Sequence, residues 1–114
     1  GALSFDGFCL FPRQRLLFYA GERLRIGDRA LDILIVLVQR QGQVVSKSNL
    51  LESVWPELHV EEGNLRVHIL SLRRVLCDGK AGRRLIVTVM GRGYAFVGHV
   101  ECGKGTGGNR PWLP

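Results

Sequence analysis

The sequence predicts an α+β domain in which short antiparallel strands precede three helices and a C-terminal β-hairpin. Three observations predict this order. Residues 3–27 alternate short apolar runs with turn-forming residues, residues 28–77 carry apolar side chains at helical spacing, and residues 86–97 contain two apolar runs around a Gly-rich turn. A chain of 114 residues has room for one such domain with one hydrophobic core.

The N-terminal strands are predicted to form a meander of three or four members. The apolar runs 8–11, 16–19 and 24–26 are separated by Pro12-Arg13-Gln14 and by Ala20-Gly21-Glu22, and both separators are typical of turns.

Two helices are predicted between residues 28 and 55. Asp28 is expected to cap the first helix and Gly42 to end it, whereas Ser46 caps the second and Pro56 ends it. Val44-Val45 is expected to form no more than a bridge. The residues expected to face the core are Leu31, Leu34, Ile35 and Val38 in the first helix and Leu50, Leu51, Val54 and Trp55 in the second.

The third helix, residues 61–77, is predicted to have two different faces. At about 100° per residue, the apolar side chains that fall together on one side are Leu65, Ile69, Leu72 and Leu76. Val67 and Arg74 lie opposite, flanked by Asn64, Leu70 and Ser71, while Arg66, His68 and Arg73 occupy the edges.

The outer face of this helix has the chemistry needed to read base edges in a major groove. Asn64 can pair with adenine, Val67 can touch a thymine methyl group, and Ser71 can donate or accept a hydrogen bond. The arginines of the helix are expected to reach phosphates, namely Arg66, Arg73 and Arg74. The alternative is an ordinary solvated helix with two exposed aliphatic side chains.

Residues 86–97 are predicted to form a hairpin whose tip is Met90-Gly91-Arg92-Gly93. Arg92 either enters an adjacent minor groove or keeps an exposed turn soluble. Tyr94 either bonds a phosphate or packs on the third helix. Lys47, at the start of the second helix, either holds a phosphate or belongs to a helix cap.

Charge is concentrated where these features lie. Residues 61–98 contain seven Lys or Arg against three acidic residues, a net charge of +4 out of the total of +6. Clustered positive charge beside a helix that fits a groove is typical of a nucleic-acid-binding protein.

Several other classes of function find no support in the sequence. The longest apolar run, residues 33–38, is far shorter than the roughly 20 residues of a membrane span. Three cysteines without a C-x-x-C pair favour a reducing, cytoplasmic compartment, and no metal site, cofactor site or catalytic arrangement is expected. The domain is predicted to cover residues 1–100, with residues 101–114 as a flexible Gly-rich tail or linker.

The order of elements, together with Val44-Val45-Ser46 and Val54-Trp55-Pro56, resembles the winged helix-turn-helix DNA-binding domain of OmpR/PhoB-type regulators. The match is most specific in Asn64-Leu-Arg-Val-His-Ile-x-x-Leu-Arg-Arg-x-Leu76, which looks like the recognition helix. Val89-Met-Gly-Arg-Gly-Tyr-Ala-Phe96 looks like the wing. The resemblance implies a bacterial transcription regulator of two-component or one-component signalling, including ToxR/CadC-like and ATPase-fused arrangements.

The resemblance also implies particular contacts. Recognition-helix contacts fall on Asn64, Val67, His68, Ser71 and Arg74, and wing contacts fall on Arg92 and Tyr94. The loop holding Glu57, Leu58 and His59 corresponds to the segment that touches RNA polymerase in such domains. The implied DNA is a direct-repeat operator bound by a head-to-tail pair of domains, with a monomer in isolation.

This chain departs from the family at Gly63, Leu70 and Ser71, where many members have basic residues. The departures predict weaker binding by the domain alone and a different operator. They also leave open an alternative function, a winged helix that binds proteins and has only non-specific affinity for DNA.

Overall fold

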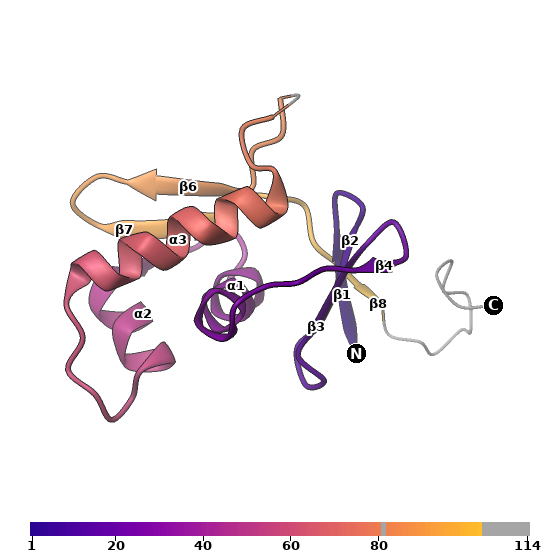
Figure 1. Ribbon diagram of the computed structural model, residues 1–114. Helices are drawn as coiled ribbons and strands as arrows, with labels where there is room; N and C mark the ends of the chain where they lie inside the picture. Colours follow the sequence, from indigo (N-terminus) through magenta and orange to yellow (C-terminus); the bar gives the residue numbers. More distant parts are fainter. Residues whose placement is uncertain (81, 104–114) are drawn as a thin grey trace. The chain divides into compact units, whose positions relative to one another are not determined.

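The computed structural model describes residues 1–80 and 82–103, and these residues belong to two compact units (Figure 1). The first unit comprises Gly1–Arg25 together with the chain from His99 onward, and the second comprises Ile26–Gly98. The α+β architecture, with three helices and antiparallel sheets, is as the sequence predicts.

The first unit is an antiparallel sheet in the order β4-β3-β2-β1-β8. Its strands are β1 (Ala2–Phe5), β2 (Phe8–Phe11), β3 (Leu16–Tyr19), β4 (Glu22–Arg23) and β8 (Glu101–Gly103). Asp6-Gly7 and Ala20-Gly21 make two-residue turns in which both residues have positive φ, the geometry that suits the twist of a tight hairpin. The predicted meander is therefore confirmed.

Two details of this sheet differ from the prediction. The fourth strand lies at Glu22–Arg23 and not at residues 24–26; just after it, Leu24 donates its amide hydrogen to the Leu17 carbonyl, 2.8 Å away. Residues 101–103, expected to be flexible, form β8, in which Cys102 pairs with Leu3. Backbone pairing needs no apolar side chains, so composition gave no sign of this strand. Residues 104–114, the rest of the predicted tail, lie outside the described residues.

Cys9, on β2, provides a test of this sheet. Burial raises the pKa of the Cys9 thiol, an effect partly opposed by a hydrogen bond with Ser4. A raised pKa leaves less thiolate at a given pH, and the thiolate is the nucleophile. We expect iodoacetamide at pH 8 to modify the exposed Cys77 well before the half-buried Cys9, as measured by peptide mass spectrometry. Equal rates at the two cysteines would contradict this account.

The second unit contains three helices and a three-stranded antiparallel sheet, β5-β7-β6 (Figure 1). Its elements are α1 (Asp28–Gln39), β5 (Val44–Ser46), α2 (Lys47–Val54), α3 (Glu62–Leu76), β6 (Ile86–Val89) and β7 (Gly93–Phe96). Helix α1 contacts α2, α3 and β7 and so lies at the centre of this unit. Across the described residues, no helix has the length and apolarity to cross a membrane.

The starts of the first two helices are defined differently. Ser46 caps α2 as predicted, because its hydroxyl accepts a hydrogen bond from the Asn49 amide at 3.0 Å. The cap of α1 is Gly27, and Asp28 is instead the first helical residue, where its carboxylate lies near the positive end of the helix dipole. Strand β5 is also more than a bridge, since all three of its residues pair with β7.

The core of the second unit follows the helical spacing of the sequence. All four residues predicted to form the buried face of α3 are at most 1% exposed. Leu31, Leu34 and Val38 of α1 are buried as expected, whereas Ile35 is half-buried and Ile33 is buried in its place. In α2, Leu50 and Val54 are buried and Leu51 is half-buried. This packing leaves the opposite side of α3 in solvent.

Candidate nucleic-acid interface

The solvent side of α3 presents the mixture of side chains that the sequence predicts. Val67 is 63% exposed and Leu70 is 51% exposed. Asn64, Arg66 and Arg74 are also exposed, and Ser71 is half-buried. The face therefore combines apolar, hydrogen-bonding and cationic groups, all on one rigid helix of 15 residues.

His68 lies at the edge of this face and packs against the core. Its ring centroid is 5.6 Å from that of Trp55, with the two rings tilted by 46°. On α1, the Arg29 guanidinium lies 5.8 Å from the Trp55 ring and donates a hydrogen bond to the Val54 carbonyl at 3.0 Å. Trp55 thus contacts cationic or imidazole groups from two other helices, which fixes the end of α2 relative to α1 and α3.

The N-terminal ends of α2 and α3 are joined by an ion pair. The Lys47 ammonium lies 3.7 Å from the Glu62 carboxylate, and both side chains are partly exposed. An exposed ion pair of this kind contributes little to stability, typically below about 1 kcal/mol. The Lys47 cation is consequently held beside the first turn of α3 by a weak contact.

The hairpin of β6 and β7 ends in a turn whose side chains are open to solvent. Met90 is 89% exposed and Arg92 is exposed, while the Arg92 amide donates to the Val89 carbonyl at 2.9 Å to close the turn. Tyr94 is different, because its side chain is only 5% exposed. Of the two alternatives for Tyr94, the structure favours packing.

Gly93, at the start of β7, allows β5 to approach the hairpin closely. It pairs with Ser46 of β5 and with Val89 of β6, at φ +150°. A Cβ atom at this position would lie 2.0 Å from the Val45 carbonyl oxygen, far inside van der Waals contact. Only glycine fits, and strand β5, which leads directly into α2, is thereby joined to the wing.

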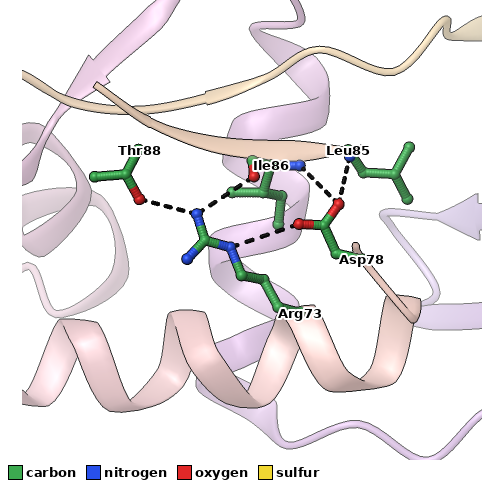
Figure 2. Close-up of polar contacts among 5 residues, drawn as sticks. All are labelled: Arg73, Asp78, Leu85, Ile86 and Thr88. Carbon is green, nitrogen blue, oxygen red and sulfur yellow. Dashed lines mark hydrogen bonds and ion pairs between the residues drawn. The ribbon is translucent and has the colours of Figure 1, made fainter. Parts of the chain in front are cut away.

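A polar cluster joins α3 to β6, as Figure 2 shows. The Arg73 guanidinium donates to the Thr88 hydroxyl at 2.9 Å and to the Ile86 carbonyl at 3.3 Å. Its Nε lies 3.6 Å from a carboxylate oxygen of Asp78. The other oxygen of Asp78 accepts hydrogen bonds from the amides of Leu85 and Ile86. We call these five residues the α3–β6 junction.

The junction gives two residues a structural role. Arg73 was predicted to reach a phosphate; its guanidinium donates hydrogen bonds to β6 in the structure, and the phosphate contact stays a prediction. Asp78 lies just beyond residues 61–77, the range predicted for the third helix. In the structure, Cys77 closes the helix in the left-handed conformation, with the Asp78 amide bonded to the Arg73 carbonyl at 2.9 Å. The Asp78 side chain, 8% exposed, organises the start of β6.

The loop between α2 and α3 contains the three residues predicted to touch a polymerase. Glu57, Leu58 and His59 are all exposed, and the Leu58 amide bonds to the Trp55 carbonyl at 3.3 Å. Among the described residues, no group of three His, Cys, Asp or Glu side chains is arranged to hold a metal ion.

Comparisons with known proteins agree with the arrangement of three helices and a C-terminal hairpin in this domain. The family model described as "Transcriptional regulatory protein, C terminal" matches residues 21–96. The probable transcriptional regulator ycf27 of Porphyra purpurea is 32% identical over 107 residues, which cover 91% of this chain and 44% of that protein. The chain therefore spans less than half the length of this relative.

Two solved structures share the fold. The DNA-binding domain of CpxR from E. coli has a TM-score of 0.75 and 33% identity, covering 85% of this chain and 96% of that one. The DNA-binding domain of Klebsiella pneumoniae RstA, solved in complex with the RstA box, has a TM-score of 0.74 and 26% identity, covering 86% and 98%. The chain therefore belongs to the family of C-terminal domains of transcriptional regulatory proteins, with the winged helix-turn-helix fold of OmpR/PhoB-type regulators.

Proposed function

We propose that this domain binds double-stranded DNA sequence-specifically, as the effector domain of a transcriptional regulator. Helix α3 enters the major groove, and the β6–β7 wing contacts the adjacent backbone or minor groove. The observation that carries the proposal is the solvent face of α3, where uncharged base-reading groups lie between arginines on a helix fixed to the wing. The complex of the related RstA domain with its RstA box supports this mode.

The side chains of the site divide into groups with different roles in the proposed complex. Asn64, Val67 and Ser71 read base edges, because they are uncharged and lie on the solvent face of α3. Arg66, Arg74 and Lys47 contact phosphates, and Arg92 reaches the backbone or minor groove from the wing tip. His68 lies at the rim, where its imidazole is suited to a phosphate at the groove edge. The role is binding, without catalysis, in the cytoplasm where the operator lies.

The loop of Glu57, Leu58 and His59 is the proposed contact with RNA polymerase. Its three side chains are exposed and come from the connection between the two helices of the helix-turn-helix. We further propose that the isolated domain is a monomer, and that two domains assemble head to tail on a direct-repeat operator.

The first test is selection from a randomised duplex pool, followed by salt titration of the winning sequences by fluorescence anisotropy. Enrichment of a repeated motif, bound about 10³-fold or more tightly than random DNA, is the expected result. No enrichment, with a steep dependence on salt, would leave only charge-driven binding. That result would favour the alternative of a protein-binding winged helix, for which the exposed Val67, Leu70 and Leu58 offer apolar surface.

Substitutions should separate the phosphate contacts from the base contacts. Arg74→Ala and Arg92→Ala are expected to weaken binding to matched and scrambled duplexes alike and to lower the salt slope by about one each. Asn64→Ala and Ser71→Ala should instead reduce the preference for the matched duplex by about 1–3 kcal/mol. Salt titrations of the four variants on both duplexes measure the affinity for each duplex and its dependence on salt.

The matched control is Arg23→Ala, which removes the same charge from an exposed position on β4. It should leave the affinity for both duplexes, and so the preference for the matched one, close to that of the unsubstituted domain. The division of roles would be wrong if all four variants lost affinity and selectivity in the same proportion.

A further inference from the structure

The solvent face of α3 has an apolar centre that the proposed base contacts do not fully explain. Val67 and Leu70 are both more than half exposed and stand three residues apart, so their side chains are neighbours on the helix surface. They lie on the side opposite the buried Leu65 and Ile69. We call this pair the Val67–Leu70 strip.

The surroundings of the strip are polar and cationic. Arg74 lies one turn after Leu70 and two turns after Val67, Arg66 flanks the Leu70 side, and Asn64 flanks the Val67 side. Gly63 precedes the strip by one turn, and a Cβ atom there would meet nothing within 4 Å. The backbone is thus bare at this end of the strip, which permits a close approach by a partner.

The charge of the rim indicates what kind of partner covers the strip. Within α3 the acidic residue is Glu62, and its carboxylate is paired with Lys47. The partner must therefore be anionic around its edge and apolar at its centre. A DNA major groove meets both conditions, because phosphates line its edges and the thymine C5-methyl is the apolar group displayed on its floor.

We infer that Val67 and Leu70 contact the methyl groups of thymines in neighbouring base pairs, and that Leu70 is a specificity-determining residue of this domain. The inference rests on the proposed function. Side chains three residues apart on a helix have Cβ atoms about 5–6 Å apart, which lets the pair span two base pairs stacked about 3.4 Å apart. The operator consequently carries thymines on adjacent base pairs at the centre of the α3 footprint.

The test replaces each thymine of the selected duplex, one at a time, with deoxyuridine. Deoxyuridine keeps the hydrogen-bonding groups of thymine and lacks only the methyl group. The affinity of the unsubstituted protein for DNA should fall about three- to fourfold when the thymine of either of two adjacent base pairs is replaced. This is the effect of losing the burial of one methyl group. In the Leu70→Ala variant this loss of affinity should disappear at one of the two base pairs, and in the Val67→Ala variant it should disappear at the other.

Two further variants control for indirect effects. Leu70→Met keeps an apolar side chain on the strip and should keep the dependence on the methyl group. Val97→Ala removes an exposed apolar side chain beyond the far end of β7, away from the wing tip, and should leave every deoxyuridine effect unchanged. Alanine favours the helix, so Leu70→Ala should fold, which a thermal melt verifies.

The outcomes separate this inference from the proposed function. A selected motif whose affinity is unaffected by any deoxyuridine would overturn the inference and leave sequence-specific binding intact. A methyl effect that persists in both Leu70→Ala and Val67→Ala would overturn the assignment to the strip. Failure to select any motif would overturn the inference together with the proposed function.

Discussion

Replacing Gly93 with alanine is expected to destabilise the domain by about 3 kcal/mol or more, the largest effect expected of a glycine-to-alanine change among the described residues. The added Cβ would lie 2.0 Å from the Val45 carbonyl oxygen, and the contact is with backbone that cannot rotate away. Strand β5 must move off β7, so the register between Val45 and Tyr94 is lost. Urea unfolding followed by circular dichroism measures the change.

Gly91→Ala is the matched control for this prediction. Gly91 also has a positive φ, +71°, but a Cβ atom there would meet nothing within 4 Å. Its replacement should therefore cost only the strain of a left-handed alanine, about 1–2 kcal/mol. Equal losses for the two variants would mean that backbone strain alone, and not the approach of β5, requires glycine at position 93.

Replacing Asp78 with alanine is expected to cost about 3 kcal/mol in the free energy of unfolding and to loosen the wing from α3. The substitution leaves the Leu85 and Ile86 amides and the Arg73 guanidinium without the carboxylate that they share. Unsatisfied buried donors cost about 1–3 kcal/mol each, and a partly buried cation that loses its partner adds to this. Hydrogen exchange of the β6 amides, together with urea unfolding, measures both effects.

Asp78→Asn and Thr88→Val divide the contributions within the junction. Asparagine keeps a carbonyl oxygen for the Leu85 and Ile86 amides but removes the charge that faces Arg73, so its loss should be smaller than that of alanine. Thr88→Val removes one acceptor of the partly exposed Arg73 and should cost about 1 kcal/mol or less. If Asp78→Ala were as mild as Thr88→Val, the carboxylate would not be the centre of the junction.

The features that sequence alone predicted are those set by local periodicity and local chemistry. The four buried residues of α3 follow from a spacing of three and four residues, and the exposed Val67 and Leu70 follow from the same helical geometry. The Ser46 cap is equally local, because the hydroxyl and the amide that it binds are three residues apart.

The features that sequence missed depend on elements distant in the chain. The bond from Arg73 to Thr88 was not predicted, because the position of Arg73 on the helix does not reveal that a residue 15 positions later lies within reach. Gly93 was recognised as a turn residue, but its closeness to β5 depends on which strand pairs with β7. In strand β8, Cys102 pairs through the backbone with Leu3, 99 positions earlier, and no pattern of side chains in the sequence indicates this pairing.

The α3–β6 junction has a consequence for the spacing of an operator. Arg73 and Asp78 fasten the C-terminal part of α3 to the base of the hairpin through several bonds at once, while Gly93 locks the other strand of the hairpin to β5. These bonds therefore hold α3 and the hairpin, the two elements proposed to contact DNA, at a fixed separation. A single inserted base pair moves its neighbours along the duplex by about 3.4 Å. Two protein elements held at a fixed separation cannot follow that displacement. In the proposed complex, this fixed separation would constrain the distance along the duplex between the bases that α3 reads and the site that the wing contacts.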